Sequence, residues 1–357
     1  MKLTINFAIV GCGMVSRLHL AAIREIDDAR LVGVYDADGA AAQKVAAEQG
    51  VKVYPSYDAL LADSDVDAVC ICTPSYLHAE HARQALKAGR HVLVEKPLAL
   101  TTEDCDSLIR LAEERGVQIG VVSQLRFSPA VRCVKQALTK GLLGRLTRAD
   151  LYMKYYRTQE YYDTGAWRGT WDKDGGGALM NQGIHGVDLL LYLMGPVSSI
   201  YAQYGTLARE IEVEDTLSAV MTYQGGALGV IEASTADWPG TPRRIEINGE
   251  YGRIVLEEDR IVTFQVEGED AYQLNEQAAG GAASHNNPGA VNPAGHCEQL
   301  KNFISAVRGD TALLVDARAG RAAVALVLAA YRSQKQGKPV AVNTPWQENC
   351  EQYVENS

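Results

Sequence analysis

The hydrophobic pattern in the first third of the chain alternates between short apolar runs and segments with helical spacing. Runs rich in valine and isoleucine predict strands at residues 5–11, 30–36, 51–55, 66–74, 91–97 and 117–124. Apolar positions recur with helical spacing at residues 17–26, 78–89 and 104–116. Strands that are apolar on both faces and alternate with helices are typical of a parallel sheet covered on both sides. We therefore predict a doubly wound α/β domain over residues 1–124.

The pattern changes after residue 124, where longer strands and hairpin signals replace the regular alternation. Residues 145–157 have a strand-like pattern, and the pairs Gly225-Gly226 and Asn248-Gly249 each separate two alternating runs, as in β-hairpins. Residues 276–296 have no period and are rich in Gly, Ala, Asn and Pro, which predicts a long loop. Helical spacing is found at residues 129–141, 297–309 and 319–337. We expect residues 125–357 to form an α+β domain with a large, mainly antiparallel open sheet.

Composition agrees with a two-domain globular protein. The length of 357 residues exceeds what one compact core usually supports, and the chain is 47% hydrophobic and 22% charged. Its formal net charge of −10 gives little attraction to nucleic acid or to an anionic membrane. No apolar run reaches the roughly eighteen residues of a membrane span, and the N-terminal run is too short for a signal peptide. We expect a cytoplasmic protein with neither nucleic acid nor membrane as a partner.

The cysteines do not indicate a disulfide framework or a metal site. There are seven, an odd number scattered along the chain, which favours reduced thiols. Cys70 and Cys72 lie in a strand-like apolar run, and we interpret them as packing thiols rather than metal ligands. No metal is predicted.

Three polar residues interrupt the apolar segment from Gly175 to Gly195. Asn181, His185 and Asp188 fall at positions i, i+4 and i+7, so on a helix they share one face. That face either completes a buried network or lines a cleft.

A dinucleotide-binding pattern lies at the junction of the first strand and the first helix. Gly11 and Gly13 stand in a Gly-x-Gly-x-x-Ser sequence: the first permits a tight turn and the second lets the backbone approach a pyrophosphate. Met14 and Val15, in the same loop, are expected to contact the cofactor. Asp36 ends the second strand, where a carboxylate binds ribose hydroxyls and repels a 2′-phosphate. We therefore predict NAD rather than NADP, with a helix N-cap as the simpler role of Asp36.

The fifth strand ends in Glu95-Lys96-Pro97. Ligands of doubly wound sheets bind beyond the carboxyl ends of the strands, so this tripeptide is expected beside the cofactor. A solvated surface lysine is the alternative, but the position at a strand end favours a functional Lys96.

With these features the chain resembles the glucose-fructose oxidoreductase, inositol dehydrogenase and rhizopine-catabolism (Gfo/Idh/MocA) family. The resemblance spans nearly the whole chain in the right order. It rests on the glycine loop, on CTPSYLHAEHA at 72–82, EKP at 95–97, GGGALMNQGIHGVDLL at 175–190, and the C-terminal segments HCEQLKNFISAVRGD and YRSQKQGKPV.

The resemblance implies that Lys96, Asn181 and His185 face the nicotinamide and the substrate. Many family members carry Asp where this chain has Asn181, and an amide cannot transfer a proton, so an orienting role is expected for Asn181. Asp188 is close enough along a helix to fix the tautomer of His185, or serves the structure alone.

Family position suggests further contacts. Those expected for the cofactor are Thr73, Pro74, His78, Glu95, Gln124, Trp167 and Arg168. Those expected for the substrate, besides Lys96, Asn181 and His185, are Arg126, Tyr156, Tyr162 and Trp167. His78 has an equally good alternative as a helix cap, and the aromatic segment containing Tyr161, Trp167 and Trp171 has a core-forming alternative.

We therefore predict an NAD-dependent oxidoreductase that transfers a hydride between a secondary hydroxyl of a sugar, cyclitol or sugar derivative and nicotinamide. His185 is the expected general base and Lys96 stabilises the alkoxide, although a lysine base with histidine as its orienter is the alternative. The principal alternative substrate is a UDP-N-acetyl-glucuronate-type sugar oxidised at C3 with tightly bound NAD.

Two further functions are compatible with an NAD-binding fold. A glycoside-processing enzyme would use bound NAD transiently, to oxidise the sugar, permit elimination of the glycoside and then reduce the sugar again. A non-enzymatic NAD-binding regulator would need neither Lys96 nor His185, so their presence argues against that role. A homodimer or homotetramer formed through the second sheet is expected.

Overall fold

The computed structural model describes residues 4–268 and 293–343. The chain divides into two compact units: Met1–Gln124 with Asn292–Arg321, and Leu125–Val291 with Ala322–Ser357. Each unit is described by itself.

Unit 1 is built on a parallel sheet. Its strands are β1 (Ile5–Val10), β2 (Ala29–Tyr35), β3 (Lys52–Val53), β4 (Ala68–Ile71), β5 (His91–Val94) and β6 (Ile119–Val121). Its helices are α1 (Ser16–Arg24), α2 (Gly39–Gln49), α3 (Tyr57–Ala62), the 3-10 turn η1 (Ser75–Leu77), α4 (His78–Lys87), α5 (Thr102–Arg115) and α9 (Ala294–Val307).

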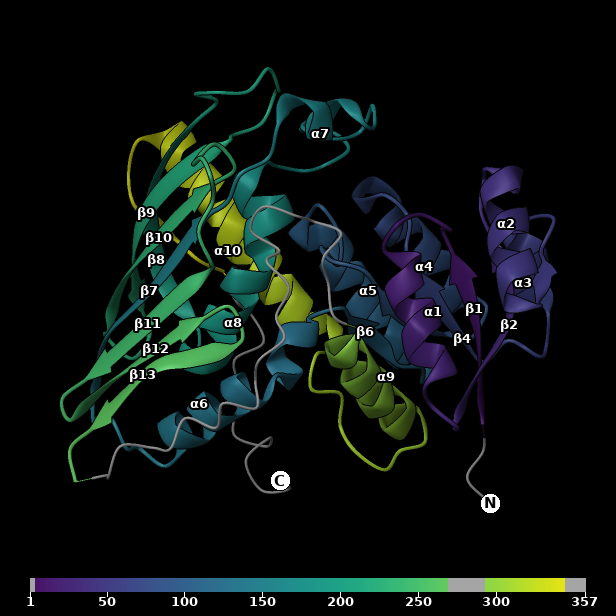
Figure 1. The fold of residues 1–357 in the computed structure, drawn as a ribbon, viewed down its shortest axis with the longest axis horizontal. Helices are drawn as coiled ribbons and strands as arrows, with labels where there is room; N and C mark the ends of the chain where they lie inside the picture. Colours follow the sequence, from purple (N-terminus) through teal and green to yellow (C-terminus); the bar gives the residue numbers. More distant parts are fainter. Residues whose placement is uncertain (1–3, 269–292, 344–357) are drawn as a thin grey trace. The chain divides into compact units, whose positions relative to one another are not determined.

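The six strands lie in the order β3-β2-β1-β4-β5-β6, and every neighbouring pair is parallel. The four consecutive residues from Phe7 to Val10 are all buried, which requires cover on both faces because successive side chains point to opposite sides. Helices flank the sheet in Figure 1. The prediction of a doubly wound Rossmann domain is confirmed.

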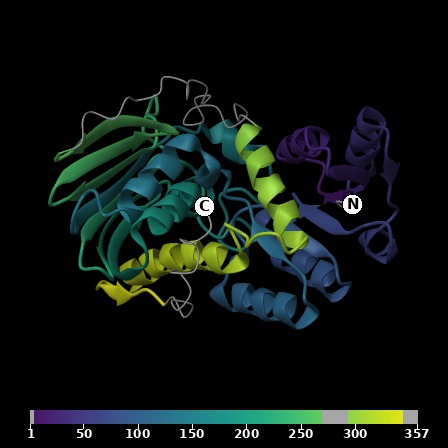
Figure 2. The same ribbon diagram turned by 90° about the horizontal axis from the view of Figure 1, so that it is seen from below.

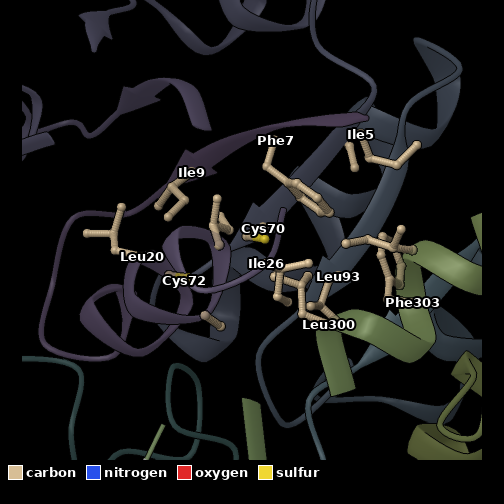
Figure 3. Packing of buried hydrophobic residues seen from close by; sticks show 14 of the residues in the cluster. Ile5, Phe7, Ile9, Leu20, Ile26, Cys70, Cys72, Leu93, Leu300 and Phe303 are labelled. Atoms are coloured by element: carbon tan, nitrogen blue, oxygen red, sulfur yellow. The ribbon is translucent and has the colours of Figure 1, made fainter. Parts of the chain in front are cut away.

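Helix α9 adds a distant part of the sequence to this unit. Leu300 and Phe303 pack into the same core as Phe7, with the two aromatic rings 6.2 Å apart (Figure 3). Figure 2 shows α9, in yellow-green, beside purple α1. Residues 292–321 therefore group with unit 1, whereas the sequence pattern suggested one uninterrupted C-terminal domain over 125–357.

Unit 2 is an α+β structure. Its strands are β7 (Leu146–Lys154), β8 (Val197–Gly205), β9 (Thr216–Tyr223), β10 (Leu228–Ser234), β11 (Arg244–Gly249), β12 (Gly252–Glu257), β13 (Arg260–Val266) and β14 (Val340–Ala341). Its helical elements are α6 (Pro129–Thr139), α7 (Gln159–Asp163), the π-helical η3 (Ala178–Gly183) and α8 (Ile184–Met194). A 3-10 turn, η2 (Gln124–Phe127), leads into the unit, and α10 (Ala317–Gln336) begins in unit 1 and continues here.

The eight strands lie in the order β13-β12-β11-β7-β10-β9-β8-β14, and only the β10/β7 pair is parallel. The predicted mainly antiparallel sheet is thus confirmed. The Gly225-Gly226 hairpin joins β9 to β10 as expected. Asn248-Gly249 instead ends β11, since Asn248 pairs with Arg253 and the turn falls at Glu250 and Tyr251. The predicted loop at 276–296 lies mostly outside the described residues, and its last three residues open α9.

Helices α6, α8 and α10 lie against one face of this sheet (Figure 1). On the opposite face of β9 and β10, Val220 is 55% exposed and Leu228 60% exposed. In the described part of the chain, no helix is both long and apolar enough to span a membrane.

Candidate functional site

The glycine loop follows β1 and has the geometry of a pyrophosphate cradle. Gly11 has a φ of +93°, and a Cβ at this position would come within 2.6 Å of the Cys72 carbonyl oxygen. Only glycine fits there without strain. A Cβ on Gly13 would meet nothing within 4 Å, so the backbone is open at this point. Met14 is exposed and Val15 half-buried beside it.

Ser16 replaces the third glycine of the motif at the first residue of α1. Its side chain is fully buried and its hydroxyl donates to the Gly13 carbonyl at 2.7 Å. A small residue here lets α1 pack closely on β1, so the serine retains the function of the missing glycine.

Asp36 lies at the end of β2 with both carboxylate oxygens directed at backbone. One accepts from the Cys12 amide at 2.6 Å and the other from the Asp38 amide at 2.8 Å. Each oxygen has a second lone pair for a ribose hydroxyl, so the bonds are compatible with the predicted NAD contact. The N-cap of α2 is Asp38, which accepts from Ala40 and Ala41, and the alternative role of Asp36 as the cap is therefore wrong.

The segments after β4 and β5 are joined by a buried imidazole. His78 lies with Nδ1 2.6 Å from the Pro97 carbonyl oxygen and Nε2 2.9 Å from the Thr73 carbonyl oxygen. Both ring nitrogens are therefore engaged inside unit 1. The side chain makes no capping bond to α4, so the capping role is not found, and contact of His78 with the cofactor stays a prediction.

Four other residues predicted to contact the cofactor lie in unit 1. Thr73 is half-buried, with its hydroxyl 3.2 Å from His81 Nδ1, and Pro74 leads into η1. Lys96 is half-buried at the end of β5. Gln124 ends the first segment of unit 1, and its side-chain oxygen is buried without a hydrogen-bond partner among the described residues.

Glu95 has partners within unit 1, and its expected contact with the cofactor stays a prediction. Its side chain is almost fully buried, and one oxygen lies 2.9 Å from His19 Nε2 while the other accepts from the Lys96 amide at 3.3 Å. The residue patterns did not single out His19. The signal available was its place on the buried face of α1, beside Leu20 and Ile23.

His296 from α9 completes this cluster. Its ring meets that of His19 edge-on at 5.7 Å, and ligand atoms of His19, Glu95 and His296 lie within 4.8 Å of one another. These are donor types found in metal sites. Burial lowers the pKa of His19, but the neighbouring Cys72, Cys70 and Glu95 outweigh it and hold that pKa well above its usual value. The raised pKa favours the protonated ring, in which the 2.9 Å contact of His19 with Glu95 is an ion pair.

The segment that carries Asn181 and His185 begins as a π-helix. Asn181 lies in η3 and His185 is the second residue of α8, both half-buried. The Asn181 amide nitrogen donates to Asp174 at 2.6 Å, and because a carboxylate only accepts, this bond fixes the orientation of the amide. The sequence pattern predicted one α-helix, but the segment begins with π-helical turns. Such turns are rare in proteins overall and are frequently found at functional sites.

One buried residue caps the start of η3. Glu214 accepts through its side chain from the amides of Gly177 and Leu179, at 2.8 and 2.9 Å, and through its carbonyl from Ala178 at 2.9 Å. The hydroxyl of Tyr331 donates to the same carboxylate at 2.8 Å. Burial raises the pKa of Glu214 to about 7. A Cβ on Gly177 would lie 1.7 Å from the Glu214 carbonyl oxygen, which explains the glycine at this position.

Asp188 is paired with Arg126 in a buried, two-pronged ion pair. Arg126 Nε and Nη2 donate to the two carboxylate oxygens at 2.8 and 2.6 Å, and the guanidinium stacks on Tyr192. Asp188 therefore has a structural partner, and the positive charge of Arg126 is balanced by Asp188 even when no substrate is bound. The expected role of Arg126 in substrate binding stays a prediction.

A cluster of arginines stacks on aromatic rings of the segment that follows β7. The Arg168 guanidinium lies 4.5 Å from the ring centres of both Tyr161 and Trp167 and donates to the Tyr161 hydroxyl at 2.7 Å. Arg209 stacks on the half-buried Tyr156 at 5.0 Å. Among the described residues, neither Arg168 nor Arg209 makes an ion pair with a carboxylate. The cluster therefore holds positive charge that its own acidic residues do not neutralise.

Two further aromatic residues, Tyr162 and Trp171, make contacts within unit 2. Tyr162 is buried, with its hydroxyl 2.7 Å from that of Thr235, so its predicted substrate contact stays untested. Trp171 packs edge-on against Tyr331 at 5.2 Å while remaining 37% exposed, which supports the packing alternative for this residue.

Comparison with known proteins gives these features a common context. Residues 5–123 match the family model described as oxidoreductase family, NAD-binding Rossmann fold, and residues 131–255 match the GFO/IDH/MocA C-terminal domain. The chain belongs to the GFO/IDH/MocA family. It is an NAD-binding oxidoreductase, and the predicted cofactor is confirmed.

Individual relatives cover nearly the whole chain. The WlbA dehydrogenase of Bordetella pertussis, solved with NADH and UDP-GlcNAcA, is 36% identical, with a TM-score of 0.88 and coverage of 96% of this chain and 99% of that chain. The WlbA dehydrogenase of Chromobacterium violaceum, solved with the same two ligands, is 32% identical, with a TM-score of 0.85 and coverage of 96% and 97%. Inositol 2-dehydrogenase of Rhizobium meliloti is 26% identical over 345 residues, which are 95% of this chain and 100% of the relative.

Proposed function

We propose that this GFO/IDH/MocA oxidoreductase oxidises a secondary hydroxyl of a nucleotide-linked N-acetyl uronic acid, with UDP-N-acetylglucuronic acid oxidised at C3 as the model substrate. The observation that carries the proposal is the 36% identity, over 96% of the chain, to a dehydrogenase solved with NADH and UDP-GlcNAcA. A second structure with the same ligands is 32% identical, whereas the full-length inositol dehydrogenase relative is 26% identical.

The arginine cluster of unit 2 supports an anionic substrate. Arg168 and Arg209 stack on aromatic rings in a protein whose formal net charge is −10. Guanidinium groups without carboxylate partners can form charge-assisted hydrogen bonds with a diphosphate or carboxylate on the substrate. A free hexose or inositol supplies no such charge.

The chemistry assigned to this chain's residues is a proton transfer and a charge stabilisation. His185 accepts the proton of the reacting hydroxyl, because a neutral imidazole is a base near neutral pH. The Lys96 ammonium stabilises the negative charge that develops on oxygen. Bound NAD supplies the hydride acceptor, held by the loop of Gly11 and Gly13 and by Asp36.

Asn181 has an orienting role in this scheme. Its amide nitrogen donates to the buried Asp174, and this hydrogen bond fixes the orientation of the side chain in η3. Because an amide does not titrate, Asn181 contributes hydrogen bonds but transfers no proton.

The test is NADH formation by the purified protein with UDP-N-acetylglucuronic acid, UDP-N-acetylglucosamine, myo-inositol and glucose, each with NAD and with NADP. We expect a signal with NAD and the uronic acid, and a weaker one with UDP-N-acetylglucosamine. Single-turnover mixing covers the case in which bound NAD does not exchange. Activity with inositol alone would overturn the proposed substrate class.

The variants Lys96→Met and His185→Gln test the assigned roles, with Lys87→Met and His91→Gln as matched controls outside the proposed site. We expect both test variants to lose about 100-fold or more in kcat, the usual contribution of an acid–base or charge-stabilising group. If His185 is the base, the low-pH limb of the kcat profile disappears in His185→Gln. Retention of that limb, with its loss in Lys96→Met, would assign the base to lysine.

A further inference from the structure

The buried pair of His19 and Glu95 has no assigned step in the proposed reaction, yet Glu95 precedes Lys96 in the chain and accepts from its backbone amide. His19 is 2% exposed and Glu95 5% exposed. They come from α1 and from the end of β5, 76 positions apart, and their side chains meet at 2.9 Å. A buried charge pair is costly to assemble and costly to break, so its location calls for a physical role.

The pair is ionised. Burial raises the pKa of Glu95, but the bond and the charge of His19 outweigh it and bring the pKa down to about 2. The pKa of His19 is displaced upward, so both directions agree with an imidazolium facing a carboxylate. His296, from α9, is the remaining titratable ring, and burial with the charge of His19 lowers its pKa to about 4, which keeps it neutral. Cys70 and Cys72 from β4 and its end complete the surroundings.

Glu95, held by His19, also contacts the backbone of the next residue, Lys96. Its second oxygen accepts from the backbone amide of Lys96 at 3.3 Å. On the other side of Lys96, the Pro97 carbonyl lies 2.6 Å from His78 Nδ1. The main chain that carries Lys96 is therefore held on one side through His19 and on the other by His78, both from helices of unit 1.

We infer that His19 is a positioning residue: through its buried bond to Glu95 it fixes the backbone from which the Lys96 side chain extends. Glu95 also places a negative charge next to the lysine, which favours the ammonium form. The inference rests on the proposed function only in that Lys96 acts in catalysis; the physical coupling of His19 and Glu95 to Lys96 exists with or without a known substrate.

Two substitutions of His19 test the bond. Glutamine keeps a donor for Glu95 without the charge, and leucine leaves Glu95 buried and unpaired. We expect kcat per folded molecule to decrease in the order wild type, His19→Gln, His19→Leu, with a loss of about tenfold or more for leucine. KM for NAD and for the sugar nucleotide should change by less than about threefold, because an alkoxide interaction acts in the transition state. A role in folding alone would lower the amount of folded protein without this split.

A second readout does not use activity. With lysine labelled at Cε and Nζ, the Lys96 NMR signal is assigned by its absence in Lys96→Met and titrated with pH. We expect Glu95→Gln to lower the pKa of Lys96, since the neighbouring negative charge is removed, and His19→Gln to alter its chemical shift. His91→Gln, at the other end of β5 where its ring accepts from the Gln118 amide, is the matched control and should leave both unchanged.

Folded His19→Gln and Glu95→Gln proteins with wild-type kcat and an unchanged Lys96 titration would overturn the inference. If none of the sugar substrates is oxidised but the titration of Lys96 still shifts, the proposed function fails and the positioning role stands. If His19→Leu does not fold, the glutamine variants carry the test.

Discussion

Gly11 and Gly13 belong to one loop but meet opposite surroundings. At Gly11 the backbone has a positive φ and the Cys72 carbonyl blocks any side chain, whereas Gly13 is open. The first glycine therefore serves the fold, and the open backbone at the second is expected to serve the ligand. Sequence spacing identified both, but it could not assign these separate roles because the obstruction comes from the end of β4, about sixty residues further along the chain.

Alanine substitutions should separate the two roles. Gly11→Ala should lose at least about 1–2 kcal/mol of unfolding free energy from backbone strain alone, with more from the clash. The unfolding free energy of Gly13→Ala should lie within about 0.5 kcal/mol of the wild-type value. This variant should bind NAD about tenfold more weakly, a loss of about 1.4 kcal/mol in binding free energy. Urea denaturation and calorimetric titration with NAD measure the two effects. Equal stability of the two variants would contradict this assignment.

The Arg126–Asp188 pair should behave as a buried structural ion pair. Asp188→Ala leaves the guanidinium buried without its carboxylate, and we expect a loss of about 3–5 kcal/mol of unfolding free energy. The exposed pair of Arg145 and Glu250 in the same unit is the control, and Glu250→Ala should cost no more than about 1 kcal/mol. A loss of activity without loss of stability in Asp188→Ala would instead favour the predicted role in orienting His185.

At the scale of elements, the helix that carries the proposed catalytic residues depends on a remote cap. The amides of three consecutive residues at the start of η3 are satisfied by Glu214, which lies between β8 and β9. The apolar pattern predicted the helix and the position of His185. It did not predict the π-helical start or the cap, whose carboxylate comes from a distant part of the chain.

Glu214 should make stability depend on pH. Its pKa in the folded protein is about 7, above the usual 4.5, so the folded state binds the proton more tightly. Stability from this group is therefore fully present below about pH 4.5, is lost as pH rises towards about 7, and is constant above. The slope corresponds to at most about 1.4 kcal/mol per pH unit.

Denaturation of wild type and Glu214→Gln from about pH 5 to about pH 8 tests this prediction. The glutamine loses an acceptor at every pH, so a constant offset is expected in addition to the change in slope. Tyr331→Phe removes a donor that lowers the pKa of Glu214, so the decline should extend to higher pH. Parallel curves for wild type and Glu214→Gln would show that this group does not titrate in the range.

At the scale of the whole molecule, the sheet of unit 2 leaves apolar side chains on the face opposite α6, α8 and α10. Val220 on β9 and Leu228 on β10 both project from it. Exposed apolar patches of this kind commonly bind a second copy of the chain. The predicted dimer or tetramer stays a prediction.

A charge on this face should disrupt the assembly. We expect light scattering to give a mass of two or four chains for wild type and of one chain for Val220→Glu. Ser218→Glu, an exposed position on the same strand with little apolar surface to lose, is the milder comparison. A wild-type mass of one chain would remove the basis for the predicted oligomer.

The sequence alone determined the features that depend on local order along the chain. Alternating strands and helices dictated a parallel sheet, the glycine spacing located the dinucleotide loop, and the ends of strands located Asp36 and Lys96. These inferences succeed because the period of an element and the side on which a strand ends follow from the backbone geometry of neighbouring residues.

Only the tertiary structure decided which distant residues meet. It paired His19 with Glu95 across 76 positions and Arg126 with Asp188 across 62, and it placed α9 in unit 1. No periodicity encodes such pairs, because they arise when separate elements pack and buried charges or donors require partners. The residues proposed to react could therefore be identified from the sequence, whereas the residues that hold them in place were identified only from the tertiary structure.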